Sequence, residues 1–77
     1  MFTITFTAEG DDSVSIYADL REDGKVLTRE VYSDRDAFMH FEDYESFYQW
    51  FGGSADLPTL AEVKALIAEG CDYIGLD

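Results

Sequence analysis

Residues suited to acid–base or nucleophilic chemistry are few in this chain. His40 is the only histidine and Cys71 the only cysteine. A catalytic imidazole or thiolate needs a positioned partner, and the sequence places no obvious one beside either residue. No nucleophile elbow, P-loop or dinucleotide-binding glycine pattern occurs. We therefore expect a protein that is not an enzyme and that uses no cofactor.

One acidic pattern has the spacing of a calcium loop. Positions 1, 3, 9 and 12 of an EF-hand loop would be Asp34, Asp36, Glu42 and Glu45. The sixth position would then fall on Met39, where the turn of such a loop requires glycine. The same segment also alternates like a β-strand, and a single cysteine cannot build a thiolate metal cage. The sequence thus predicts no metal site.

Charge is the strongest feature of the composition. Seventeen Asp and Glu face five Lys and Arg in 77 residues, which gives a net charge of −12. A surface of this sign repels phosphate and anionic membranes and attracts basic proteins. We expect no direct binding to nucleic acid or membrane. The lone cysteine, and the lack of a leader or of a long apolar run, favour a cytoplasmic protein.

The length and the apolar content predict one folded domain over residues 1–77. A strand is expected over 2–8, where Phe2, Ile4 and Phe6 alternate with threonines. A turn follows over 9–12, and a second alternating strand covers 13–21. Its inward residues are predicted to be Val14, Ile16, Ala18 and Leu20.

The sharpest local signal is Asp23-Gly24. Asp-Gly between two alternating runs predicts a two-residue type I′ hairpin. This register pairs Glu22 with Lys25, and it sets which residues share a face. The predicted core-face pairs are Leu20 with Leu27, Ala18 with Arg29, and Ile16 with Val31. The predicted outer-face pairs are Tyr17 with Glu30 and Asp19 with Thr28.

The C-terminal half is predicted to be mainly helical. After a turn at 33–36 and a fourth strand over 37–41, Asp43 caps a helix over 44–51 that ends at Gly52-Gly53. A capping box from Thr59 to Glu62 starts a second helix, which Gly70 closes before an extended apolar tail at 71–76. The buried stripes are expected to be Tyr44, Phe47, Tyr48 and Phe51 on the first helix, and Leu60, Val63, Leu66 and Ile67 on the second.

These elements predict an α+β fold: a four-stranded antiparallel β-sheet meander with two helices packed on one face. The other face and its hairpin end are the predicted partner-binding surface, made of Tyr17, Asp19, Glu22, Asp23, Glu30 and Tyr32. Tyrosines among carboxylates are typical of binding surfaces. Same-face strand residues lie about 6.6–6.8 Å apart, close to two steps of a nucleic-acid strand. Carboxylates at this spacing could mimic phosphates.

The segment from Phe41 to Phe51 resembles a strand-to-helix segment of a family of small phage anti-CRISPR proteins that inhibit type I-F surveillance complexes. The matching features are Phe41, the acidic residue after it, Glu45, the apolar residue Phe47, and Trp50-Phe51. The order and length of the preceding hairpin and the following helix are also similar. The resemblance implies a protein that binds the crRNA-guided complex in the host bacterial cytoplasm and blocks target DNA. No functional residue of that family maps onto this chain.

Three functional hypotheses result. The first is a phage-encoded inhibitor, monomeric or dimeric, that binds a basic subunit of a type I CRISPR effector through a DNA-mimicking surface. The second is an antirestriction protein or another DNA mimic with a different basic target. The third is a small acidic structural domain with no inhibitory role. The acidic turns at Asp11-Asp12 and Asp34–Asp36 are the next candidate contact surfaces.

Overall fold

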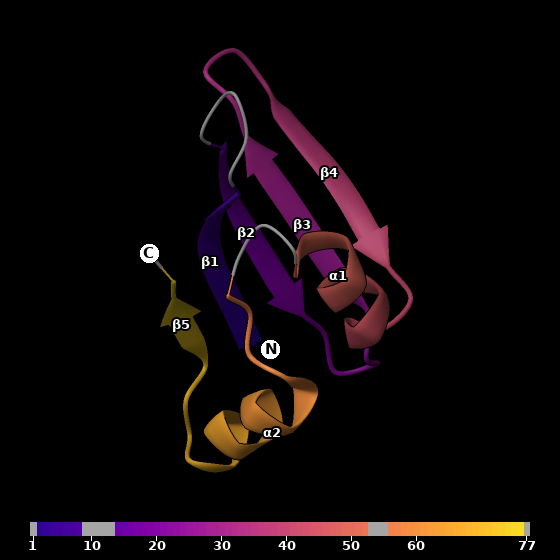
Figure 1. Cartoon of the computed structure of the whole chain (residues 1–77), viewed down its shortest axis with the longest axis vertical. Coiled ribbons are helices and arrows are strands. Elements are labelled where there is room, and N and C mark those ends of the chain that lie inside the picture. The colour runs from indigo at the N-terminus through magenta and orange to yellow at the C-terminus, as the bar shows by residue number, and fades with distance from the viewer. Residues whose placement is uncertain (1, 9–13, 53–55, 77) are drawn as a thin grey trace.

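The computed structural model describes residues 2–8, 14–52 and 56–76. The turn expected over 9–12, including Asp11-Asp12, and the helix end at Gly53 lie outside the described residues. The strands form one sheet in the order β4-β3-β2-β1-β5 (Figure 1). The elements in chain order are β1 (Phe2–Ala8), β2 (Val14–Leu20), β3 (Val26–Val31), β4 (Asp36–Phe41), α1 (Tyr44–Phe51), α2 (Leu60–Ala68) and β5 (Tyr73–Gly75).

The α+β class is confirmed, but the sheet is mixed rather than purely antiparallel. The expected extended tail forms β5, which runs parallel to β1 and places Ile74 beside Ile4. The Thr3 N–H donates to the Asp72 carbonyl at 2.9 Å, and the Leu76 N–H donates to the Thr5 carbonyl at 2.7 Å. A fifth strand forms because the free edge of β1 offers unpaired backbone groups to the returning chain.

The hairpin between β2 and β3 has a three-residue loop, so the predicted register was wrong by one residue. The Arg21 N–H donates to the Lys25 carbonyl at 2.9 Å, and the Gly24 N–H donates to the Arg21 carbonyl at 3.0 Å. Gly24 has φ 89°, the left-handed conformation that follows a type I turn in such loops. Asp23 stabilises the loop by accepting from the Lys25 N–H at 3.0 Å. Leu20 therefore pairs with Val26.

This register inverts the predicted faces of β3, because neighbouring strand residues point to opposite sides. We call the side of the sheet that packs against α1 the helix face. Val26 and Thr28 are buried there, whereas Leu27 and Arg29 lie on the other side. We call that other side the open face; its side chains are Thr3, Thr5, Thr7, Ser15, Tyr17, Asp19, Leu27, Arg29, Val31, Asp36, Phe38, His40 and Tyr73.

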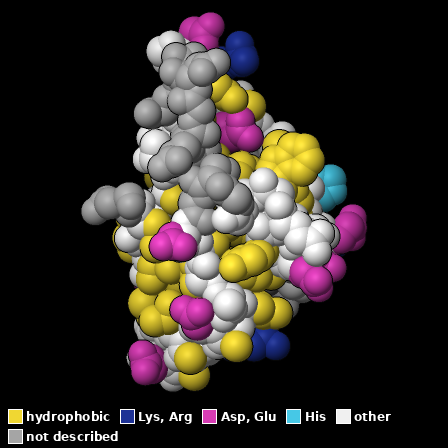
Figure 2. Space-filling model, in the orientation of Figure 1, with side chains coloured by type: hydrophobic (Ala, Val, Ile, Leu, Met, Phe, Trp, Pro, Cys, Tyr) yellow, Lys and Arg dark blue, Asp and Glu magenta, His cyan; other side chains and the backbone are white. Residues whose placement is uncertain are grey.

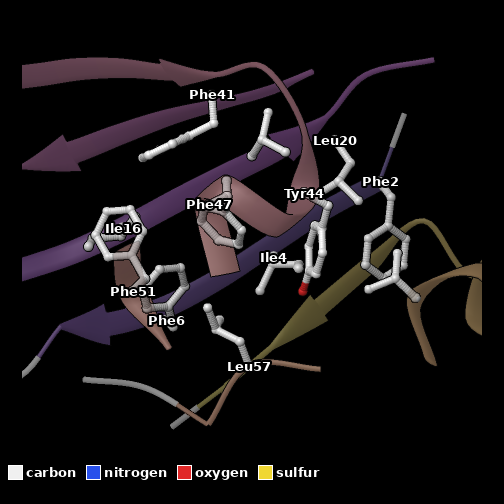
Figure 3. Close-up of a cluster of buried hydrophobic side chains, with 13 residues drawn as sticks. Phe2, Ile4, Phe6, Ile16, Leu20, Phe41, Tyr44, Phe47, Phe51 and Leu57 are labelled. Atoms are coloured by element: carbon white, nitrogen blue, oxygen red, sulfur yellow. The ribbon is translucent and has the colours of Figure 1, made fainter. Parts of the chain in front are cut away.

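The core lies between the helix face and α1 (Figure 3). Asp43 caps α1 as predicted, its carboxylate accepting from the Ser46 N–H at 2.8 Å. Phe47 is fully buried and packs edge-on against Phe6 and Phe41, with ring centroids 6.1 and 5.8 Å away. Tyr48, predicted to be buried with this stripe, is instead exposed, with its ring 6.3 Å from that of Tyr44.

The second helix contributes less to the core than predicted. The capping box is present, with the Glu62 N–H donating to Thr59 Oγ1 at 3.2 Å, and Gly70 closes the helix at φ 89°. Only Val63 of α2 is buried; Leu60 and Ile67 are exposed, contrary to prediction. The reason is position: α2 lies at one end of the sheet (Figure 1), where Val63 is buried in the core and Leu66 packs against it while partly exposed. Neither helix of the described chain is long and apolar enough to cross a membrane.

Candidate protein-binding surface

The structure divides the six predicted contact residues among three places. Tyr17 and Asp19 lie on the open face of β2, as predicted. Glu22 and Asp23 are exposed in the loop that extends the same hairpin. Glu30 pairs with Ile16 on the helix face, so its predicted position beside Tyr17 was wrong. The physical reason is the one-residue shift in the register of β3, which moves each of its side chains to the opposite face of the sheet.

Tyr32 belongs with Glu30 rather than with Tyr17. Its hydroxyl donates to Glu30 Oε2 at 2.7 Å, and the Arg35 Cζ lies 4.8 Å from the centre of its ring. The hydrogen bond to Glu30 is the main reason that the pKa of Tyr32 is raised. These three side chains form a separate cluster at the turn between β3 and β4, outside the open face.

The open face carries large side chains, and two of them, Leu27 and Arg29, were predicted to lie on the core face. Tyr17, Arg29 and Phe38 lie in one row across β2, β3 and β4. Phe38 is 73% exposed, and the Arg29 Cζ lies 4.9 Å from the centre of the Tyr17 ring. Leu27 is also exposed on this side. The correct hairpin register would have placed Leu27 and Arg29 here, beside Asp19 and Tyr17.

Polar groups fill the remaining part of the open face. Asp19 accepts from the Thr3 hydroxyl at 2.8 Å, and the hydroxyls of Thr5 and Tyr73 lie 2.9 Å apart. The outward residues of β2 include a single carboxylate, that of Asp19. The open face therefore has no row of carboxylates along a strand, which is the spacing that phosphate mimicry requires.

Carboxylates gather instead at one end of the sheet, because Val26 pairs with Phe41 and the chain segments beside them leave the sheet together. We call this region the acidic end. Asp43 has a lowered pKa, chiefly because its carboxylate accepts the backbone hydrogen bond from Ser46. The acidic end consists of Glu22, Asp23, Glu42, Asp43 and Glu45, all of them exposed.

A groove of about 580 Å³ separates α2 from the hairpin end and the start of α1. Its floor is apolar, and the exposed side chains Leu60 and Ile67 line it. At the start of α1, the Tyr44 hydroxyl donates to the Pro58 carbonyl, and burial is the main cause that raises its pKa to about 12. Charged groups of both signs line the groove: Arg21, Lys64, Glu22 and Asp43.

The carboxylates with calcium-loop spacing do not come together. Asp34 and Asp36 lie at the start of β4, whereas Glu42 and Glu45 follow its end, so the whole strand separates the two pairs. Among the residues that the structure describes, His, Cys, Asp and Glu side chains form no group of three or more that could hold a metal ion. His40 lies on the open face, and the Cys71 thiol donates to the Tyr73 carbonyl at 3.3 Å.

The negative charge is not neutralised within the described part of the chain. No lysine or arginine there forms an ion pair with a carboxylate. Arg29 and Arg35 lie over tyrosine rings instead. On the helix-bearing side, acidic side chains are distributed over the surface, with hydrophobic side chains between many of them (Figure 2). The carboxylates are thus available to cations outside the molecule.

Comparison with protein-family models, with curated proteins and with solved structures finds no match for this chain. The resemblance of the segment from Phe41 to Phe51 to the anti-CRISPR family stays a prediction. The open face, the acidic end and the net charge are the features of the molecule that bear on its function.

Proposed function

We propose that this protein is a binding protein that covers a basic, nucleic-acid-binding surface of another protein. The observation that carries the proposal is the net charge of −12 in a chain whose described cations form no ion pair with its carboxylates. Self-repulsion of this size costs stability in the free protein. The basic groups of a partner reduce this repulsion between carboxylates. The charges that destabilise the free protein therefore favour binding.

The contact surface of this proposal is continuous along β2 and its loop. Tyr17 and Asp19 lead along the open face to Glu22 and Asp23 at the acidic end. Carboxylates accept strong, charge-assisted hydrogen bonds from the Lys and Arg side chains that otherwise hold phosphate. Tyr17 supplies the aromatic area that typically anchors an interface. The partner is thus a protein with a cationic patch beside an apolar depression.

The proposed partner is a subunit of a type I CRISPR effector complex, and the proposed effect is to block binding of target DNA. The resemblance of the segment from Phe41 to Phe51 supports this choice, together with the chemistry of the surface. An antirestriction protein would use the same charges against a different enzyme. The two proposals differ in the target that the protein inhibits, so an inhibition assay with each target distinguishes them.

The test measures binding of a target-DNA duplex to a purified type I-F effector complex, with increasing amounts of this protein. We expect DNA binding to be lost, and we expect the inhibition to weaken as salt rises, since exposed charge pairs are screened. The protein alone should not shift the DNA. An undiminished effector–DNA complex would reject the CRISPR proposal. Inhibition of a restriction enzyme in a parallel assay would then support the alternative.

A pair of matched variants separates a specific surface from net charge alone. Glu22→Lys with Asp23→Lys reverses two charges at the acidic end. Glu69→Lys with Asp72→Lys makes the same change after α2, where both side chains are exposed. We expect only the first pair to reduce inhibition. Equal losses from both pairs would show that overall charge, and not this surface, drives binding.

A further inference from the structure

The two edges of the sheet differ in how well they are protected. One edge is β5, which has only three residues, and the other is β4, which has six. Natural sheets block open edges with short strands, lysines, prolines or bulges. The β4 sequence from Asp36 to Phe41 contains neither lysine nor proline. In Figure 1, no described element covers the outer side of β4.

The hydrogen-bond pattern identifies which backbone groups of β4 are free. The Tyr32 N–H donates to the Arg35 carbonyl at 2.8 Å, so residues 32 and 35 are a hydrogen-bonded pair. Hydrogen-bonded and non-bonded pairs alternate along an antiparallel ladder. Residues 37, 39 and 41 therefore bond to β3. The N–H and C=O groups of Asp36, Phe38 and His40 point to the outer edge, without a partner in the described part of the chain.

We propose that this edge pairs with a second copy of the chain, antiparallel and centred on Phe38. Only that register uses all the outward backbone groups. It places Phe38 opposite Phe38 of the second copy, and Asp36 opposite His40 of the second copy, twice by symmetry. The edge is thus self-complementary: an imidazole donor faces a carboxylate acceptor on each side of an aromatic pair.

The exposure of these side chains supports a second copy as the occupant. Phe38 is 73% exposed, the largest exposed fraction among the large hydrophobic residues that the structure describes. Pairing covers its ring and joins two sheets into one, with the open faces of both copies on the same side. The net charge of −12 on each copy opposes association. We therefore expect the dimer to strengthen as salt rises, because salt screens the long-range repulsion.

Charge variants test the register. His40→Glu places like charges opposite Asp36 in a homodimer, and Asp36→Lys places cation opposite imidazole, so each alone should weaken the dimer about tenfold or more. A mixture of the two variants restores an opposite-charge pair and should form heterodimers. Ala65→Glu and Glu69→Lys make the same charge changes on or after α2, away from β4. These controls should dimerise like the wild type.

The measurement is sedimentation equilibrium of the full chain at low and at high salt. Phe38→Pro removes an outward N–H, a position where an edge strand tolerates proline, whereas Phe38→Thr keeps that N–H. We expect a dimer for the wild type, a monomer for Phe38→Pro, and the predicted exchange in the mixed charge variants. A wild type that stays monomeric at high salt and millimolar concentration overturns the proposal. So does a dimer unaffected by His40→Glu and Asp36→Lys.

Discussion

The guanidinium of Arg29 lies over the ring of Tyr17, with its Cζ 4.9 Å from the ring centre. The two residues are direct cross-strand partners on β2 and β3. Their contact exists only in the register that the three-residue loop creates. In a two-residue loop, Arg29 would face Ala18 and Tyr17 would face Glu30. A single residue in a turn thus decides whether the open face presents a cation or a carboxylate beside Tyr17.

Gly24 should be the most sensitive residue of the β2–β3 loop. Gly24→Ala has open space for its methyl group but must adopt φ 89°. The left-handed conformation costs an L-residue roughly 1–2 kcal/mol, so we expect a loss of that size in the free energy of unfolding. Gly24→Asn should lose less, because asparagine tolerates this conformation better. Urea unfolding measures both; equal stability of wild type and Gly24→Ala would contradict the observed loop.

Substitutions at Asp19 and Glu30 test which face of the sheet contacts the partner. Asp19→Lys changes the open face, and Glu30→Lys makes the same charge change on the helix face. Each removes one hydrogen bond, from Thr3 and from Tyr32 respectively. We expect Asp19→Lys to weaken partner binding and Glu30→Lys to leave it nearly unchanged. The measurement is the affinity of each variant for the partner at one salt concentration, with thermal melting as a folding control. The opposite order would place the contact on the helix face.

The unequal roles of the two helices predict unequal costs of truncation. Phe47→Ala removes a fully buried ring and should cost about 3–5 kcal/mol, a large share of the stability of a small domain. Ile67→Ala removes a side chain that is 49% exposed beside the groove, and should cost less than about 1 kcal/mol. Chemical denaturation of both variants gives the comparison. Similar losses would mean that α2 packs more tightly than the structure shows.

Tyr44 should make the fold sensitive to alkali. Its folded-state pKa is raised from 10.0 to about 12, chiefly by burial, so the protonated phenol stabilises the fold. This contribution is fully present below pH 10.0 and is lost as the pH rises through about 12. Circular dichroism against pH should show the loss.

Tyr44→Phe provides the matched control for this effect. It keeps the ring but removes the hydrogen bond to Pro58, which should cost about 1 kcal/mol at neutral pH. Because phenylalanine cannot ionise, this variant should lose less additional stability in alkali than the wild type. An identical alkaline transition in both proteins would assign the effect to other groups.

Local patterns in the sequence determined most of the elements. Alternation predicted β1 over residues 2–8, and the caps at Asp43 and Thr59 placed both helix starts. These signals act within a few residues, since a cap or an alternating strand needs only its near neighbours. The negative charge is also fixed by composition, whatever the fold.

Only the tertiary structure decided which side chains share a surface. Asp23-Gly24 is compatible with a two-residue loop and with a three-residue loop. The packing of Val26 and Thr28 into the core selects the three-residue loop. That choice moves Glu30 and Tyr32 away from Tyr17 and brings Arg29 beside it, between Tyr17 and Phe38. The pairing of β5 with β1 is likewise a contact between distant parts of the chain. Side-chain alternation has a period of two, so one residue in the register inverts a face that local propensity cannot distinguish.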